Sequence, residues 1–290
     1  MIEIFIILRQ KLLFLYSYLK SAILGFIFRK RYRSIKTVCL FLGYPRSGHS
    51  LIASLLDAFP DVVMGMEWGV FPNIELGYKK NQVFYSLVRN SYLFRKRRKN
   101  IWTGYSYKVP GGWQGKVRKL LVIGDKHGGR TSLMLRKNPD LLSRFEKVTG
   151  YKPKLIHIMR NPFDMMTTHA IRWYEDNHLP QFPTDKDLLP QIQKFFYRAD
   201  IIRKLKMENY YKILDIYHEE FVLDPRGQLS KILQFIDIQS DIQYIENCAS
   251  IVFSTPNVSR KRINWPAELI EYVEKKLKEY PFLSRYRFSD

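Results

Sequence analysis

The residues best suited to chemistry form the segment 43–50, GYPRSGHS, in which two glycines lie five positions apart and a serine follows. A glycine-containing turn before a helix presents backbone N–H groups, and the helix N-terminus favours an anion. The spacing is that of the NTPase phosphate loop, but His49 replaces the lysine that bridges the β- and γ-phosphates. A cation, Arg46, lies inside the loop instead. The segment therefore predicts an anion site without the NTPase lysine.

A second candidate phosphate site lies in residues 160–168, RNPFDMMTT. Arg160 is expected at the end of a strand, and Thr168 on the helix that follows. A guanidinium supplies charge-assisted hydrogen bonds to a phosphate, and a hydroxyl supplies a neutral one. We interpret Asp164 as the N-terminal cap of this helix.

Two further segments carry candidates for acid–base chemistry. Glu67 follows the first expected helix, and Lys126 and His127 follow an apolar run. Histidine titrates at about pH 6.5, which suits a general base. We place Glu67 first as the base and His127 second, although Glu67 can equally be a surface acid and His127 a structural residue. Asp125 is the one candidate Mg²⁺ ligand, and Lys126 follows it directly, so we expect no metal.

The expected secondary structure brings these segments together. Apolar runs predict strands at residues 37–43, 120–123, 154–159 and 213–217, and helical patterns follow at 48–59, from Pro162, at 225–236 and from Pro266 to about 279. Alternating strands and helices indicate an α/β fold, a parallel β-sheet with helices on both faces. Because ligands bind at the carboxyl ends of such strands, the segments 43–50, 124–130 and 160–168 should meet.

The two phosphate motifs together resemble those of the sulfotransferases that use 3′-phosphoadenosine 5′-phosphosulfate (PAPS). YPRSGHSLIASLL resembles the 5′-phosphosulfate loop, commonly Pro-Lys/Arg-Ser-Gly-Thr-Thr/Ser, with His49 in place of the usual threonine. IMRNPFDMMTT resembles the 3′-phosphate motif, Arg-Asn-Pro-x-Asp followed by a serine, with Thr168 at the serine position. YHEEFVLDPRGQLSKILQFI, residues 217–236, is similar to a further family segment. The resemblance spans about residues 37–288.

This resemblance implies a P-loop NTPase-like fold and sulfuryl transfer from PAPS to a hydroxyl or amine, with PAP as the product and no metal. It implies that the 5′-phosphosulfate is cradled by Arg46, Ser47, Gly48, His49 and Ser50. The 3′-phosphate would contact Arg160, Thr168 and Arg260, the last in a basic turn. The leaving group needs a cation and the acceptor needs a base. Arg46 and then Lys126 are the candidates for the cation, and Glu67 and then His127 for the base.

Composition narrows the partners. The chain has 290 residues, 46% hydrophobic, and a formal net charge of +21, which favours anionic partners. Between residues 79 and 137 there are 16 Lys or Arg and one acidic residue. This basic stretch is either a solvated face or a surface that recruits an anionic acceptor such as a glycolipid or polysaccharide. Cys39 and Cys248 make no disulfide framework, so we expect a reducing compartment.

Residues 4–28 are very apolar, but Arg9, Lys11 and Lys20 interrupt them and a basic cluster at 29–33 follows. A spanning helix needs roughly 20 apolar residues. We therefore expect a helix lying on an anionic membrane surface, with packing on the domain or a partner subunit as the alternative. Residues 1–34 form this N-terminal segment and residues 35–290 the sulfotransferase domain. The expected location is cytoplasmic and peripheral to a membrane, or the Golgi membrane in a eukaryotic cell.

Two other functions compete with sulfotransfer. A P-loop kinase of small molecules would need Mg-ATP, which His49 disfavours. A basic membrane- or nucleic-acid-binding protein without enzymatic activity is the second rival. Tyr92, Phe94 and Trp102 flank the run of cations at 95–99, but we find no nucleic-acid recognition motif and do not expect nucleic acid as a partner.

Overall fold

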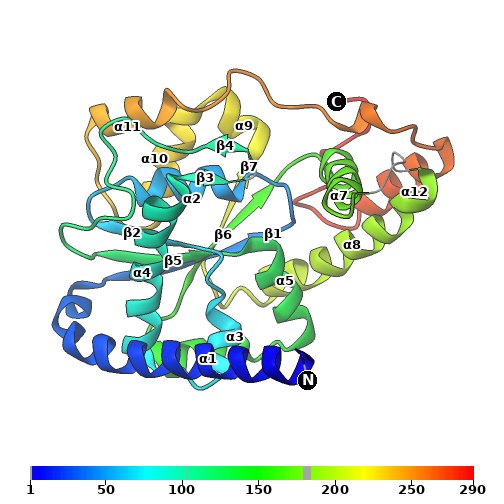
Figure 1. Ribbon diagram of the computed structural model, residues 1–290. Coiled ribbons are helices and arrows are strands. Elements are labelled where there is room, and N and C mark those ends of the chain that lie inside the picture. The colour runs from blue at the N-terminus through cyan, green and yellow to red at the C-terminus, as the bar shows by residue number, and fades with distance from the viewer. Residues whose placement is uncertain (1, 103, 179–183) are drawn as a thin grey trace.

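A parallel β-sheet of five strands organises the computed structural model, which describes residues 2–102, 104–178 and 184–290 (Figure 1). The strand order is β2-β5-β1-β6-β7, and every neighbouring pair is parallel. The strands are β1 (Thr37–Gly43), β2 (Val62–Met66), β5 (Val122–Lys126), β6 (Lys154–Met159) and β7 (Ile213–Tyr217). The predicted fold, a parallel sheet with helices on both faces, is confirmed.

The strand predictions fail at one edge of the sheet. β1, β6 and β7 have the predicted bounds, whereas β5 begins at Val122 and continues through Asp125 and Lys126, two residues that the prediction placed after the strand. β2 was not predicted. All five of its residues are buried, as are those of β1, but β2 contains Gly65 and follows Pro60 closely, and both are turn signals.

The helices divide between the two faces because successive side chains of a strand point in opposite directions. In β1, Cys39 and Phe41 join one buried cluster, and Leu40 and Leu42 join the other. The first cluster includes residues of α2 (His49–Asp57), α9 (His218–Leu223), α10 (Pro225–Phe235) and α11 (Ile242–Ala249). The sheet therefore has a separate core on each side.

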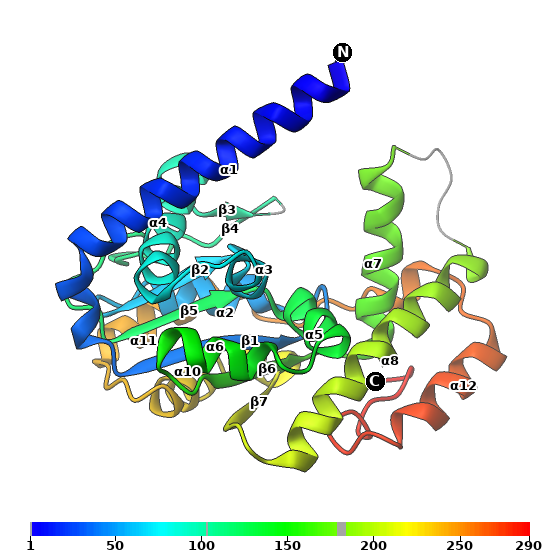
Figure 2. The same ribbon diagram turned by 90° about the horizontal axis from the view of Figure 1, so that it is seen from below.

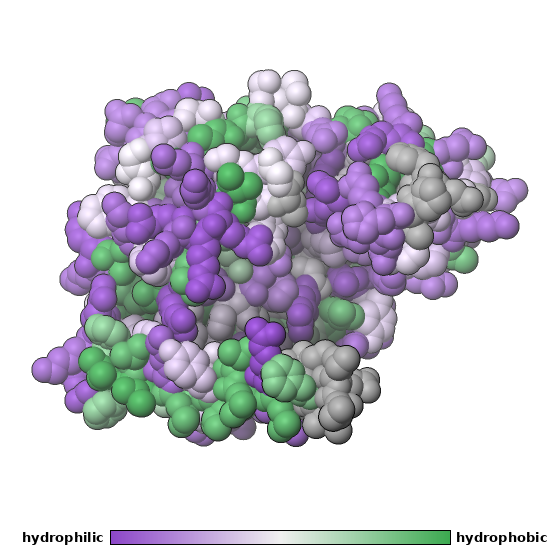
Figure 3. Space-filling view, viewed as in Figure 1, coloured by the Kyte–Doolittle hydropathy of each residue, from purple (hydrophilic) through white to green (hydrophobic). Residues whose placement is uncertain are grey.

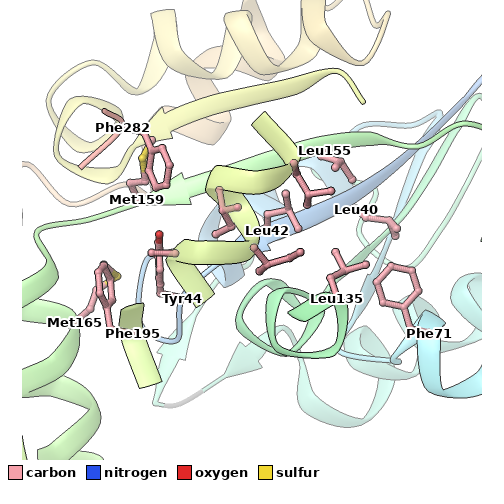
Figure 4. Packing of buried hydrophobic residues seen from close by; sticks show 14 of the residues in the cluster. Leu40, Leu42, Tyr44, Phe71, Leu135, Leu155, Met159, Met165, Phe195 and Phe282 are labelled. Carbon is pink, nitrogen blue, oxygen red and sulfur yellow. The ribbon is translucent and has the colours of Figure 1, made fainter. Parts of the chain in front are cut away.

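The second cluster is the larger one and extends beyond the sheet. It includes residues of α3 (Val70–Glu75), α4 (Lys80–Arg98), α5 (Gly128–Lys137), α6 (Leu141–Thr149), α7 (Pro162–Asp176), α8 (Asp185–Glu208) and α12 (Ala267–Leu277). Figure 4 shows part of it, where Tyr44 at the end of β1 stacks on Phe195 of α8 with ring centroids 4.2 Å apart. This packing fixes the start of the loop that follows β1.

The N-terminal helix α1 (Ile2–Ile27) packs against α4 through its second half, where Ser21 and Gly25 are buried. Its first half extends away from the rest of the molecule (Figure 2). A short 3-10 helix, η1 (Arg29–Ser34), joins α1 to β1. Among the residues that the structure describes, no helix is both long and apolar enough to cross a bilayer.

Candidate active site

The loop between β1 and α2 has the backbone of an anion site. Gly48 precedes α2 with φ of 95°, and none of the described side chains caps this helix, so the N–H groups of its first turn remain for a ligand. Arg46 also has a positive φ, 70°, which costs a non-glycine residue on the order of 1–3 kcal/mol. Such strain is typical of functional loops.

The His49 side chain points into the protein. Its Nε2 donates to the carbonyl oxygen of Leu42 at 2.9 Å, and its Nδ1 lies 2.9 Å from the Ser47 hydroxyl. Burial lowers the pKa of His49 to about 3, so the ring is neutral and Nδ1 accepts from Ser47. A Cβ on Gly128 would lie 2.1 Å from Nε2, so glycine makes room for the ring. The side chains of Ser47 and His49 therefore stabilise the loop from its buried side. Only their backbone N–H groups are left to bind a phosphosulfate.

This burial makes the contribution of His49 to stability depend on pH. The unfolded chain binds a proton at His49 below a pH of about 6.5, whereas the folded protein does so only near pH 3, so stability is lost as the pH falls. We expect the wild type to have a larger free energy of unfolding than His49→Asn. The difference between the two should fall by about 2 kcal/mol when the pH is lowered from about 7.5 to about 5. Urea denaturation of both proteins at the two pH values measures this, and a constant difference would contradict it.

Arg160, at the end of β6, is the centre of the second candidate phosphate site. It is 8% exposed, and its two terminal nitrogens donate to the carbonyl oxygens of Arg46, at 3.2 Å, and Asn257. Its buried Nε has no partner among the described residues. Burial lowers the pKa of Arg160, which an anion would offset. The structure thus joins the two predicted phosphate motifs through one arginine that retains an unused donor.

Thr168 lies on α7 with its hydroxyl 2.8 Å from the Ser259 hydroxyl. Ser259 also donates through its backbone N–H and its hydroxyl to Asp164. Thr168 and the basic turn at Arg260, which Ser259 precedes, were both predicted on the 3′-phosphate side. The two hydroxyls now form a pair that α7 and the start of η2 (Arg260–Arg262) hold in place.

One prediction in this region is wrong. Asp164 is not the cap of α7, because the Asn161 side chain accepts from the Phe163 N–H instead. The Arg260 guanidinium donates to Asp164 at 2.7 Å and to the carbonyl oxygen of Phe288, and its contact with a 3′-phosphate stays a prediction. Both side chains of the Asp164–Arg260 pair are buried, and a buried charge needs a partner. Arg260 therefore holds its turn against α7.

The Asp164–Arg260 pair predicts a large loss of stability on removing one charge. Asp164→Asn leaves the Arg260 guanidinium buried without its counter-charge, and we expect a loss of about 3–5 kcal/mol in the free energy of unfolding. Glu246→Gln is the matched control, because Glu246 pairs with Arg226 in an exposed bridge that solvent screens, so its loss should cost much less. Urea denaturation compares them, and equal losses would refute a stabilising role for the buried pair.

Glu67 and Lys126 meet where β2 and β5 end. Met66 is in register with Lys126, so Glu67, one residue further, lies beside it. Lys126 Nζ donates to Glu67 Oε1 at 2.7 Å, and the side chains are 3% and 35% exposed. Burial lowers the pKa of Lys126. Glu67 has a positive φ of 60°, so strain recurs at the second strand end.

Asp125 fixes the turn that carries Glu67. Its buried carboxylate accepts from the backbone N–H groups of Trp68, Gly69 and Val70 at 3.1, 2.8 and 3.0 Å. Burial raises the pKa of Asp125 to about 6 although these bonds oppose the shift. The residue considered above as an Mg²⁺ ligand thus positions the candidate base.

His127 is half-buried at the N-terminus of α5, and burial lowers its pKa to about 4. It lines a pocket with Gly69, Arg130 and Thr131. The structure brings His127 to the strand ends as predicted, but its ring has no hydrogen bond with Glu67 or Lys126. Glu67 remains the better-placed base.

Two residues near the site were not singled out as site residues from the sequence. The ring of His218, at the start of α9, abuts Gly48, where an added Cβ would lie 2.5 Å from Nδ1. That Nδ1 is buried without a partner among the described residues. Trp102, in the hairpin of β3 (Ile101–Trp102) and β4 (Tyr105–Ser106), has its ring centroid 5.2 Å from Lys126 Nζ. Neither has a local sequence signal, because each reaches the site from a distant element.

The family of the chain follows from a sequence comparison. The Sulfotransferase family model matches residues 40–241, a range that contains both phosphate motifs and Glu67, Lys126 and His127. The chain belongs to the sulfotransferase family. Protein-tyrosine sulfotransferase A of Caenorhabditis elegans is 23% identical over 230 residues, which cover 75% of this chain and 55% of the relative. The chain thus spans about half the length of that curated relative.

Solved sulfotransferases share the fold. The mouse sulfotransferase SULT7A1, complexed with PAP, has a TM-score of 0.50 and 15% identity over 84% of each chain. The sulfotransferase STF9 of Mycobacterium avium has a TM-score of 0.50 and 13% identity, covering 84% of this chain and 76% of its own. At these identities the likeness concerns the arrangement of the sulfotransferase sheet and helices.

Proposed function

We propose that this sulfotransferase uses PAPS as the donor and transfers its sulfuryl group to a hydroxyl or amine of an anionic acceptor. The observation that carries the proposal is Arg160, which is buried, is bonded to the loop at Arg46, and has an Nε without a partner in the part of the chain that the structure describes. One guanidinium adjoining both phosphate motifs suits a donor with a 3′-phosphate and a 5′-phosphosulfate. The PAP in the mouse sulfotransferase of the same fold supports this donor.

The proposed chemistry is an in-line displacement at sulfur. Glu67 takes the proton of the acceptor hydroxyl, the acceptor oxygen bonds to sulfur, and the bond between sulfur and the bridging oxygen of the 5′-phosphate breaks. Negative charge develops on that oxygen as PAP leaves. Lys126 and Arg46 supply positive charge there, and the proton remains on Glu67 until it passes to solvent. No step needs a metal.

The neighbours of Lys126 support an anionic acceptor. The ring of Trp102 lies 5.2 Å from Lys126 Nζ and 4.6 Å from the Arg98 guanidinium carbon. Arg98 belongs to the run of cations at the end of α4. The basic stretch therefore reaches Glu67 and Lys126, the proposed catalytic pair. There it can attract an acidic glycolipid or polysaccharide. The name of the nematode relative adds a tyrosyl peptide to the candidates.

Transfer of ³⁵S from labelled PAPS tests the proposal. The purified chain would be incubated without Mg²⁺ with acidic glycolipids, acidic polysaccharides and acidic tyrosyl peptides in separate reactions. We expect covalently bound label that survives desalting at neutral pH in at least one acceptor class, and stoichiometric release of PAP. Transfer of ³²P from Mg-ATP to these acceptors, with no use of PAPS, would instead establish a kinase.

A further inference from the structure

We infer that the outward face of α1 is a docking surface for an anionic lipid bilayer, and that docking holds the active site beside the bilayer so that the acceptor is a molecule of the membrane surface. The docking rests on α1 itself. The statement about the acceptor rests on the proposed sulfotransfer.

An apolar stripe runs along α1 on the side opposite α4. Its members recur at helical spacing on one face, and each is between 51% and 69% exposed: Phe5, Leu8, Leu12, Leu19, Ile23 and Phe26. Ser21 and Gly25, on the other face, are buried against α4. In the space-filling view, hydrophobic side chains gather along the lower edge of the molecule, where α1 lies, with a few polar residues between them (Figure 3). An exposed apolar surface of this extent indicates a binding surface.

Cations border the stripe. Helical spacing places Arg9 and Lys20 next to it, and the basic cluster of η1 follows its last residues. The Arg29 guanidinium lies 3.9 Å from the Phe26 ring centroid, so a charge adjoins the end of the apolar face. A helix with apolar side chains on one face and cations at its border binds at the interface of an anionic bilayer.

The charge of the chain argues against a second copy of this protein as the partner that covers the apolar stripe. Two chains joined through their α1 stripes would bring two basic clusters together, and each chain has a net charge of +21. Anionic headgroups would neutralise these charges instead. The bilayer therefore fits both the apolar stripe and its border.

Aromatic contacts connect α1 to the active site. The Tyr18 ring packs edge-on to Tyr78 with centroids 5.1 Å apart, and Tyr78 packs on Trp68 at 5.7 Å. Trp68 follows Glu67 in the chain, and the backbone N–H of Trp68 donates to the Asp125 carboxylate. A bilayer bound to α1 would thus have a fixed position relative to Glu67, which favours acceptors located at that bilayer.

Vesicle flotation of the full chain tests the docking, with phosphatidylcholine vesicles and with phosphatidylcholine–phosphatidylserine vesicles. We expect binding to the anionic vesicles, weakened by salt, and at least tenfold weaker binding by the double variant Leu12→Glu, Ile23→Glu. Ile242→Glu, which changes an exposed apolar residue of α11 in the same way, should bind as the wild type does. PAP affinity should be equal in all three proteins.

If the wild type binds neither kind of vesicle, the proposal of a docking surface is wrong. It is also wrong if light scattering shows a wild-type dimer that the double variant converts to monomer, because a second copy would then cover the stripe. Vesicle binding without PAP affinity would refute the proposed function and leave the docking intact. ³⁵S in an aqueous acceptor, with none in membrane-borne acceptors, would refute the location of the acceptor.

Discussion

Replacing Glu67 by glutamine is expected to slow sulfuryl transfer by about 10²–10⁴-fold, the typical contribution of a general base. The amide has nearly the shape of the carboxylate and can still accept from Lys126 Nζ, now 2.7 Å away. It cannot take the acceptor proton. PAP affinity should stay within about twofold of wild type, because Glu67 acts on the acceptor.

Single-turnover transfer from saturating ³⁵S-labelled PAPS measures the effect of Glu67→Gln. Glu75→Gln is the matched control, since Glu75 ends α3 and lies outside the proposed catalytic pair. A rate for Glu67→Gln equal to that of the control would remove Glu67 from the mechanism. His127 would then be the remaining candidate from the sequence.

Replacing Lys126 by methionine is expected to lower the transfer rate by about 10²–10³-fold, the usual cost of losing one electrostatic stabiliser of a developing anion. Methionine keeps an unbranched chain in this buried position and removes the ammonium group. The effects of Lys126→Met and Glu67→Gln should be less than additive, because the two side chains form one ion pair.

The same single-turnover assay, with the single and double variants, measures this coupling. Lys137→Met, at an exposed lysine of α5, is the control for the loss of one positive charge. Control-like activity in Lys126→Met would show that Lys126 does not stabilise the transition state. Full additivity would show that the ion pair seen in the structure does not act as a unit.

The sequence predicted the centre of the sheet and missed its edge for a physical reason. β1 and β6 are apolar runs bounded by clear turn signals, and such a run suffices to indicate a buried strand. β2 is also buried throughout, but it follows a proline closely and contains Gly65, so its five residues resemble a turn region. β5 ends in Asp125 and Lys126, whose charges are paired with backbone N–H groups and with Glu67. In the sequence alone, charged residues at the end of a strand indicate a loop, because their partners in the fold are not visible.

The candidate site shows the same limit. Types and spacing identified both phosphate motifs, and order along the chain placed them at one edge of the sheet. The direction of a side chain depends on residues far away in sequence. His49 turns inward because Gly128 leaves space and Leu42 offers a carbonyl. Arg260 pairs with Asp164, 96 residues earlier, a partner that sequence spacing alone does not indicate.

The pairing of Glu67 with Lys126 could not be derived without β2. Both residues were candidates from the sequence, but their contact follows from the register of Met66 with Lys126. Once that register is known, a base and a cation at neighbouring strand ends are a direct consequence. The structure therefore brings two separate candidates together as one ion pair.

Calorimetric titration with PAP, without Mg²⁺ and in parallel with ATP, tests the central claim most directly. Wild type, Arg160→Ala and Arg226→Ala would be compared, the last removing an exposed arginine of α10. Circular dichroism would verify that each variant is folded. We predict tight PAP binding by the wild type and Arg226→Ala, at least a hundredfold loss in Arg160→Ala, and weak binding of ATP. Absence of PAP binding by the wild type, or a preference for Mg-ATP, would contradict the assignment of PAPS as the donor.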